Sequence, residues 1–362
     1  MLLRTLMAVV ALILLYFLTW PVPVDPVAWN APKAPAYVDD YQPNQTLASF
    51  ENLTMPGLVG PEGVVVAKDG RVYATTEQGW IVRWQPGSNE AERWVKMPGR
   101  PLGIALDAAD GFWVADAFEG VFHVSAAGEL KSALTEVAGK PLLYANDLVL
   151  TPSGKLYISD STARFSAKAW GHTYTASLVD ILEHGYTGRV VEFDTHTGDS
   201  REVMTGLSFA NGVTSDSKGR FLLVNETSEY RVWKHWLAGE KAGQSEVLLD
   251  NLPGFPDNIL AGQNGRYWLG FTSPRIALLD NLADKPFVRK VVQRMPAWIR
   301  PKAKLYGHVL AIDEDGKILQ NLQDPAAGYP LTTGASEDDE YLYISSLVAN
   351  TLARIKKSNL NL

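Results

Sequence analysis

The chain has 362 residues, and its composition excludes several classes of protein. Hydrophobic residues make up 46% and charged residues 20%, as in folded globular proteins rather than disordered ones. The 33 basic and 40 acidic residues give a formal net charge of −7 without a dense Lys/Arg stripe, so we expect no nucleic-acid partner. Cysteine is absent, which excludes disulfides, thiolate nucleophiles and cysteine-based metal sites. Any bound metal must therefore be held by oxygen or imidazole.

Residues 1–24 predict a membrane anchor. Arg4 is the only charged residue before Asp25, and the apolar stretch Thr5–Val24 is about as long as a bilayer span. A cleaved signal peptide is the alternative, but Trp20–Val24 offers no small-residue cleavage site, so we favour an uncleaved anchor. Arg4 before the span, with no positive cluster after it, predicts a cytoplasmic N-terminus. The rest of the chain would then lie on the periplasmic, extracytoplasmic or luminal side.

A proline-rich linker, residues 25–44, precedes a pattern that recurs over residues 45–362. Each copy has an apolar run, a glycine-containing polar turn, a second apolar run with an aromatic, and a polar tip. The six copies are Gly63–Trp84, Gly103–Ser125, Asp147–Phe165, Gly212–Leu237, Asn258–Ser273 and Ala335–Ile355. Copies begin about 40 residues apart, except for two longer steps that contain insertions, and this spacing is typical of four-stranded propeller blades.

The repeats predict an all-β fold, a six-bladed β-propeller. Each copy is a β-hairpin, and the turns contain Gly70, Gly111, Gly154, Gly219 and Gly265, for which we expect a positive φ. A solenoid is the competing repeat architecture, but no helical period runs through these units. We expect Leu47–Leu58 to supply the outer strand that closes the ring with the last repeat.

Two insertions, Ser166–Gly188 and Pro274–Tyr306, interrupt the repeats. In the second, apolar residues fall at helical spacing beside basic ones. These apolar residues are Phe287, Val288, Val291, Val292 and Met295. The segment is either a membrane-facing amphipathic helix or a lid or packing helix on one face, and we favour the second reading.

Oxygen-bearing side chains stand immediately before the first strand of four repeats. These residues are Glu62, Asn146, Asn211 and the pair Asp257 and Asn258, whereas the other two repeats have Leu102 and Thr332–Thr333. Equivalent positions of different blades converge at the mouth of the central channel, so we expect these oxygens to meet there. Asn and Asp are also common turn formers, which is the alternative explanation for each one singly.

Two carboxylates and three amides form a hard, all-oxygen donor set that suits Ca²⁺ better than strictly octahedral Mg²⁺. No histidine stands at this position before the first strand of any repeat, which disfavours zinc. The second strands should bring Asp116, Asp160 and Glu226 to the channel rim, either beside the metal or as solvated loop acids. Asp160 or Asp147 either orients the asparagines or is a solvated loop acid. In the first insertion, His172 and His184 are the histidines to test as pocket residues, with a surface position the favoured reading.

The chain resembles the strictosidine synthase-like (adipocyte plasma membrane-associated protein-like) family in three segments, which are Ala210–Val213, Phe221–Thr227 and Gly254–Ile259. The likeness extends over roughly residues 45–355. More distantly, the chain is similar to gluconolactonases, regucalcin and paraoxonases, whose active-site calcium is bound by a glutamate, asparagines and an aspartate. That resemblance implies Glu62, Asn146, Asn211, Asp257 and Asn258 as calcium ligands.

The chain departs from these relatives at two sites. Strictosidine synthases use a glutamate in the last blade for condensation, where this chain has Tyr329–Gly334, so carbon–carbon bond formation is disfavoured. Paraoxonases place a catalytic histidine in the second blade, where this chain has Pro101–Gly103.

The favoured hypothesis is a monomeric, calcium-dependent hydrolase of lactones or aryl esters, with Asp257 or Asp160 assisting the attacking water. Its partners would be a small-molecule ester or lactone and the membrane. The alternative is a propeller with structural calcium and no turnover that acts as a binding module.

Overall fold

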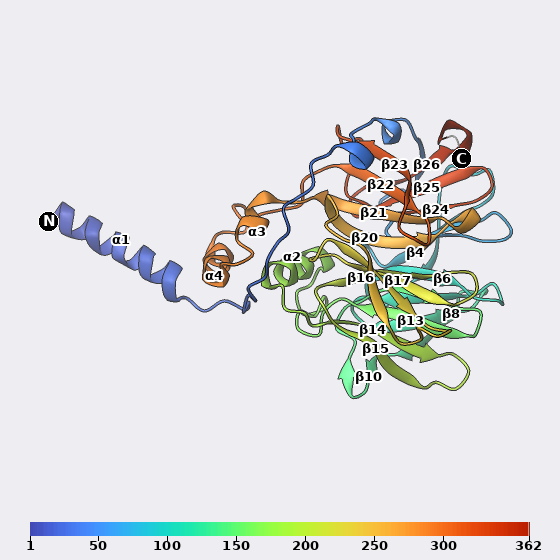
Figure 1. The fold of residues 1–362 in the computed structure, drawn as a ribbon, viewed down its shortest axis with the longest axis horizontal. Helices are drawn as coiled ribbons and strands as arrows, with labels where there is room; N and C mark the ends of the chain where they lie inside the picture. The colour runs from blue at the N-terminus through green and yellow to red at the C-terminus, as the bar shows by residue number, and fades with distance from the viewer. Residues whose placement is uncertain (361) are drawn as a thin grey trace.

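Six antiparallel sheets of four strands each surround a common axis, and an isolated N-terminal helix extends away from them (Figure 1). This architecture is seen in a computed structural model that describes residues 1–360 and 362. The predicted six-bladed propeller is confirmed.

The blades follow one another along the chain. Blade 1 contains β2 (Val64–Val66), β3 (Val72–Thr75), β4 (Trp80–Trp84) and β5 (Glu92–Lys96). Blade 2 contains β6 (Pro101–Leu106), β7 (Phe112–Asp116), β8 (Gly120–Val124) and β9 (Leu130–Leu134). Blade 3 contains β12 (Ala145–Leu150), β13 (Lys155–Asp160), β14 (Gly188–Asp194) and β15 (Ser200–Leu207). Blade 4 contains β16 (Ala210–Ser215), β17 (Phe221–Glu226), β18 (Arg231–Trp236) and β19 (Ser245–Leu249). Blade 5 contains β20 (Gly254–Ala261), β21 (Tyr267–Pro274), β22 (Gly307–Ile312) and β23 (Ile318–Asp324).

Blade 6 joins the two ends of the propeller. It contains β24 (Thr332–Glu337), β25 (Tyr341–Ser346), β26 (Thr351–Lys356) and the N-terminal strand β1 (Glu51–Thr54). The pairing of β1 with β26 runs antiparallel from Glu51↔Arg354 to Thr54↔Thr351. The closing strand therefore comes from the segment that the sequence predicted, and it covers an edge that would otherwise offer unpaired backbone groups. A short hairpin of β10 (Glu136–Val137) and β11 (Lys140–Pro141) lies outside the blades.

The core lies between neighbouring blades, so the inner strands are buried on both faces. Every residue of β17 is buried. Phe221 and Leu223 pack into the cluster shared with blade 5, whereas Leu222 and Val224 pack into the cluster shared with blade 3. Because side chains alternate across a strand, a strand between two blades needs an unbroken apolar run rather than alternation.

The hairpin turns confirm four of the five predicted glycines. Gly70, Gly154, Gly219 and Gly265 have positive φ values between 66° and 82°. In blade 2 the prediction was wrong, because Asp110 takes the left-handed conformation with φ of 59°. The neighbouring Gly111 is required for a different reason, since a Cβ there would collide with Asp107 and with the Val124 carbonyl.

Three helices from the two insertions lie on the side of the propeller that faces the N-terminal helix (Figure 1). They are α2 (Thr173–Glu183), α3 (Ala277–Asn281) and α4 (Pro286–Arg294). The N-terminal helix α1 (Leu2–Thr19) has a mean hydropathy of 2.3, and within the described residues it alone is long and apolar enough to cross a membrane. A signal sequence has the same properties. Short 3₁₀ turns occur at Asp39–Tyr41, Thr46–Ala48, Gln263–Gly265 and Lys357–Leu360.

The proline-rich linker is docked against this same side. Val27 N donates to the Glu183 carbonyl at 2.9 Å, and Trp29 N donates to the Ala283 carbonyl at 3.1 Å. The Trp29 ring stacks on His184 with centroids 4.1 Å apart. The linker therefore fixes where α1 leaves the propeller.

Candidate metal centre and pocket

Four of the five predicted ligand residues sit in β-bulges of the innermost strands, whereas Glu62 lies just before the first strand of blade 1, which has no bulge. In blade 3, Ala145 pairs with Asp160 and Leu148 with Ile158, so two residues on β12 face one on β13. The same two-against-one register recurs in blades 2, 4, 5 and 6. A bulge re-aims the side chains within it. The bulged pairs are Leu102–Gly103, Asn146–Asp147, Asn211–Gly212, Asp257–Asn258 and Thr333–Gly334.

We call the residue at the position of the predicted ligands in each blade the axial residue. Glycine follows it in four blades because a neighbouring blade packs directly against that position. A Cβ on Gly63 would collide with the Leu102 carbonyl, and one on Gly212 would collide with the backbone of Asp257–Ile259. Only Asn146 and Asp257 are followed by residues with a side chain, namely Asp147 and Asn258.

Four side-chain oxygens of the predicted ligands, from three blades, are buried without a hydrogen-bond partner among residues 1–360 and 362. They are Asn146 Oδ1, Asn211 Oδ1, Asp257 Oδ2 and Asn258 Oδ1. Each of these residues is at most 4% exposed. Leaving one such acceptor unpaired costs about 1–3 kcal/mol, so four together require an explanation. A cation between the oxygens would supply it.

Two hydroxyl groups determine which way the asparagine amides point. Ser161 Oγ donates to the Ala210 carbonyl at 2.8 Å, so it must accept from Asn146 Nδ2 at 2.9 Å. Thr227 Oγ1 donates to the Pro256 carbonyl at 2.7 Å and accepts from Asn211 Nδ2 at 3.1 Å. Because each hydroxyl has one proton, both amide nitrogens are held at the wall and both Oδ1 atoms remain for the axis.

We call the five predicted ligand residues the ring. Its two carboxylates, those of Glu62 and Asp257, are destabilised in their charged form. Burial raises the pKa of Asp257 well above its usual range, and the nearby Glu62 carboxylate raises it further. Burial also raises the pKa of Glu62, against the opposing effect of Arg100. The Arg100 guanidinium donates to Glu62 Oε2 at 2.9 Å, and both side chains are 5% exposed. A divalent cation would lower both pKa values.

The acids at the ends of the second strands fix the segments that carry the ligands. Asp116 accepts hydrogen bonds from four backbone N–H groups, including those of Gly99 and Arg100. Asp160 accepts from Tyr144 N and from Arg189 Nε, at 3.0 and 2.9 Å. Glu226 accepts from Ser208 N at 2.7 Å in the same way. All three are fully buried, so the interpretation as solvated loop acids was wrong.

The expectation that Asp147 or Asp160 orients the asparagines was also wrong, because Ser161 and Thr227 do so. Asp147 instead ties blade 3 to blade 4 through Val213 N at 3.0 Å. Burial raises its pKa to about 7. Asp160 lies behind the ring, where burial raises its pKa to about 6 against the effect of Arg189.

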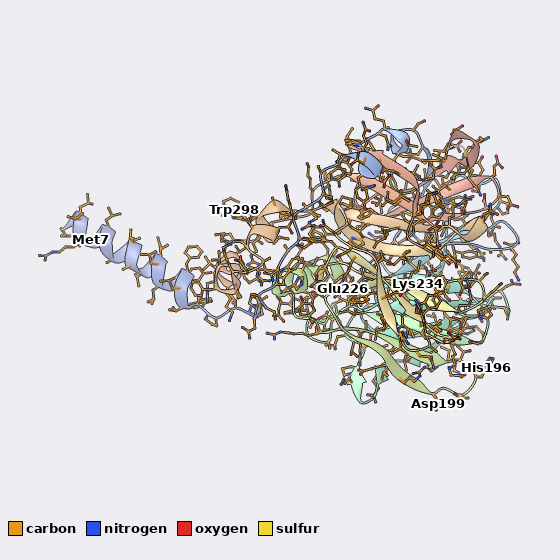
Figure 2. The ribbon with its side chains drawn as sticks, viewed as in Figure 1. Met7, His196, Asp199, Glu226, Lys234 and Trp298 are labelled. Carbon is orange, nitrogen blue, oxygen red and sulfur yellow. The ribbon has the colours of Figure 1, made fainter. Side chains whose placement is uncertain are left out.

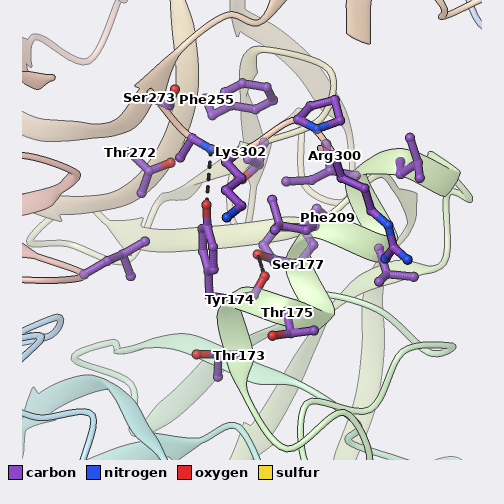
Figure 3. A pocket seen from close by; sticks show the side chains of 18 of the residues that line it. Thr173, Tyr174, Thr175, Ser177, Phe209, Phe255, Thr272, Ser273, Arg300 and Lys302 are labelled. Atoms are coloured by element: carbon purple, nitrogen blue, oxygen red, sulfur yellow. Dashed lines mark hydrogen bonds between the residues drawn. The ribbon is translucent and has the colours of Figure 1, made fainter. Parts of the chain in front are cut away.

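A pocket of about 580 Å³ opens above the ring. Its floor includes four of the five predicted ligands, and Asn258 adjoins them through Asn258 Nδ2, which lies 3.4 Å from the Glu62 carbonyl. Aromatic side chains of Tyr144, Phe209 and Phe255 form part of the wall. The upper wall consists of α2 and the chain after α4, where Tyr174 and Ser177 lie opposite Arg300 and Lys302 (Figure 3).

The two insertion histidines cap α2 and lie outside the set of described residues that line the pocket. His172 Nδ1 accepts from Tyr174 N at 3.1 Å, and its Nε2 lies 2.9 Å from Glu77. His184 ends the helix in a left-handed conformation and is 1% exposed, so the favoured surface reading was wrong for it.

The donor set fits a calcium ion. Within residues 1–360 and 362, no cluster of three or more His, Cys, Asp or Glu side chains is placed to bind a metal. The candidate site differs from such a cluster because three of its five donors are amides. Glu62, Asn146, Asn211, Asp257 and Asn258 would hold the ion through oxygen alone, which is calcium's preference. Thr333, the axial residue of blade 6, instead donates to the Glu62 carbonyl at 3.1 Å.

Known proteins resemble this chain along most of its length. A Salmo salar adipocyte plasma membrane-associated protein is 31% identical over 96% of this chain and 87% of its own length. The Bos taurus protein of the same name is 30% identical over 92% and 85%. The chain belongs to this family. Family models for strictosidine synthase-like N-terminal regions and for strictosidine synthase match residues 39–84 and 146–240.

Solved structures share the propeller fold of this family member. A Xanthomonas campestris gluconolactonase superposes with a TM-score of 0.62 at 14% identity, covering 85% of this chain and 88% of its own. A calcium-binding protein of Agrobacterium tumefaciens, regucalcin, gives 0.59 at 16% identity, covering 84% and 93%. At these identities the similarity establishes the fold alone.

Sequence reasoning missed Arg100, Tyr144 and the two orienting hydroxyls. Ser161 and Thr227 could have been found, because each directly follows one of the acids that fix the ligand segments. Arg100 and Tyr144 carry no such signal, since they lie in the connections before the first strands of blades 2 and 3.

Proposed function

We propose that this protein is a calcium-dependent hydrolase of lactones or aryl esters. The observation that carries the proposal is the set of four unpartnered oxygens on predicted ligands, in the described residues, three of which belong to residues at the floor of a pocket with apolar walls. When bound, calcium supplies positive charge that polarises a carbonyl and stabilises an oxyanion. One propeller of the same fold is described as a gluconolactonase, which is in keeping with this chemistry.

Asp257 is the proposed acceptor of the proton from the attacking water. Asp257 lines the pocket, and its Oδ2 has no hydrogen-bond partner among the described residues, so this oxygen is available to the attacking water. Asp160, the other candidate base from the sequence, has both oxygens engaged by Tyr144 N and Arg189, so the proposal rests on Asp257.

Tyr144 is a proposed hydrogen-bond donor to the substrate. Burial raises the pKa of its hydroxyl well above its usual value, so the group stays protonated at neutral pH. It lines the pocket together with Phe209 and Phe255, whose rings would bind the apolar part of the substrate and limit the access of bulk water.

We propose further that α1 is retained as a membrane anchor, with the propeller on the side away from the cytoplasm. Its length of 18 residues, its mean hydropathy of 2.3 and the absence of a small-residue cleavage site after it support this placement.

The test is a substrate screen on the full chain in detergent. γ-Lactones, δ-lactones and phenyl acetate would be assayed with EDTA and again after calcium is restored. We expect turnover that EDTA abolishes and calcium recovers. Asn211→Leu should lose this turnover, whereas Asp199→Asn, an exposed carboxylate at the opposite end of the propeller, should keep it (Figure 2).

No EDTA-sensitive turnover on any of these substrates would contradict the proposal. If calcium still raised the melting temperature, that result would favour the alternative of a non-catalytic binding module.

A further inference from the structure

The second insertion has an apolar outer surface, which we call the apolar platform. It consists of the exposed side chains Leu278, Phe287, Val288, Trp298, Ile299 and Leu305. Trp298 is 78% exposed and Phe287 is 53% exposed. An exposed apolar cluster of this kind in a folded protein marks a binding surface rather than a core.

The apolar platform adjoins the N-terminal helix directly. Tyr16 Oη donates to the Arg294 carbonyl at 3.0 Å. The Arg294 side chain, in turn, donates to the Phe17 carbonyl at 2.9 Å and to the Trp20 carbonyl at 2.5 Å. Arg294 thus satisfies carbonyl groups at the C-terminal end of α1, which has no later turn to bond them. The C-terminal ends of α1 and α4 therefore lie next to each other (Figures 1 and 2).

The linker holds this arrangement in place. Lys290 Nζ pairs with Asp25 at 2.7 Å, and Arg164 donates to the Pro23 carbonyl at 3.1 Å. Val24 is 2% exposed and packs against Phe165 and Val179 of the first insertion. A helix tethered by these contacts cannot swing to another face of the propeller, so a membrane crossed by α1 would meet the apolar platform.

The same insertion also forms the upper wall of the pocket. Leu279 and Val292 face the pocket from α3 and α4, and Ala297 and Trp298 continue the wall. One short segment thus has an inner surface toward the pocket and an exposed apolar outer surface. The elements that form this wall lie on the side of the propeller from which α1 extends (Figure 1).

Charge and aromatic content fit the headgroup region. Arg300 and Lys302 line the pocket near Trp298, and Lys304 is exposed two residues later. Tryptophan is enriched at membrane interfaces, and cations there meet lipid phosphates. Trp20 at the end of α1 and Trp298 on the apolar platform match this pattern.

We propose that the apolar platform inserts into the bilayer crossed by α1, so that the pocket receives lipophilic substrates from the membrane. The substrate class would be esters or lactones with a hydrocarbon chain, whose acyl part crosses from the lipid into the apolar upper pocket. This statement of substrate class rests on the proposed hydrolase function. Membrane insertion of the apolar platform rests instead on the proposed anchor α1 and on the contacts that hold it beside the platform.

The absence of cysteine allows insertion to be measured at single sites. The full chain would carry Phe287→Cys, outside the set of described pocket-lining residues, or the control Asp199→Cys at the far end of the propeller (Figure 2). Each would be labelled with a polarity-sensitive nitrobenzoxadiazole dye and reconstituted in phosphatidylcholine vesicles. We expect a blue-shifted emission at residue 287 that doxyl-labelled lipid quenches several-fold more than at residue 199.

Equal quenching at the two sites would overturn the proposal. A blue shift at residue 287 that depends on protein concentration and resists doxyl lipid would mean that a second copy of the chain covers the apolar platform, which would also overturn it.

The substrate class has a separate readout. Phe287→Ser and Ile299→Ser, both on the outer surface, should lower the hydrolysis of a long-chain lactone in vesicles several-fold and leave that of water-soluble phenyl acetate unchanged. Equal loss on both substrates would contradict delivery from the membrane. If neither substrate is hydrolysed at all, the proposed function fails, while the quenching result still decides membrane insertion.

Discussion

Replacing Thr227 with valine removes an orienting hydroxyl without changing the side-chain volume. Thr227 is 3% exposed, and the change breaks its bonds to Asn211 Nδ2 and to the Pro256 carbonyl. Each of the two stranded polar groups costs about 1–3 kcal/mol, so we expect the free energy of unfolding to fall by about 2–6 kcal/mol. For the propeller of residues 45–362, an unfolding entropy of about 0.7 kcal/mol/K converts this into a melting temperature about 3–9 °C lower.

The same change should weaken calcium binding. With Thr227 gone, the Asn211 amide can rotate, and loss of an outer-shell partner typically costs about 10–100-fold in metal affinity. Thr227→Ser is the matched control, because it retains the hydroxyl and should bind calcium normally. Affinity would be measured by calorimetric titration and stability by thermal unfolding in EDTA. If Thr227→Val bound calcium as tightly as Thr227→Ser, the proposed role of this hydroxyl in aiming Asn211 would be refuted.

Three further substitutions test separate parts of the structure. Arg100→Met leaves Glu62 buried without its partner, at a cost of about 3–5 kcal/mol; calcium should raise the melting temperature more in this variant than in the wild type, and an equal rise would contradict the pairing. Asp160→Asn should lower stability through Arg189 yet keep EDTA-sensitive turnover, and loss of turnover in a folded variant would restore Asp160 as the base. Burial lowers the pKa of His308 from 6.5 to about 3, so the unfolded chain binds a proton that the folded chain rejects. Stability should therefore decline below about pH 6.5, by about 2 kcal/mol at pH 5 from this group. His308→Gln should flatten that decline. If the free energy of unfolding, measured by chemical denaturation, fell with pH as steeply in this variant as in the wild type, the role given to His308 would be contradicted.

The features that repeat along the chain could be predicted from the sequence. Six copies of one hairpin pattern determine the propeller, and the phase of each copy identifies the axial residues even though the bulges themselves leave no mark in the sequence. The closing strand was predictable because an odd outer strand must complete the last blade. The axial phase identified all five candidate ligands, four of which line one pocket floor.

The features that depend on contacts between distant segments could not be predicted. The docking of the linker on the insertions joins residues more than a hundred positions apart, as in the bond between Val27 and Glu183. The roles of the second-strand acids were misjudged because their partners are backbone N–H groups, which every residue except proline possesses. The amphipathic pattern of α4 left two readings open; Val292 lines the pocket, as a packing helix requires, and the exposed Phe287 leaves the membrane-facing reading a prediction.

The central claim is that the axial oxygens form a calcium site. Calorimetric titration of calcium into the full chain in detergent, after removal of metal with EDTA, tests it most directly. We expect one calcium per chain in the wild type and in Asp199→Asn, and no binding in Asp257→Ala. Absence of binding to the wild type, or binding that survives Asp257→Ala unchanged, would contradict the account.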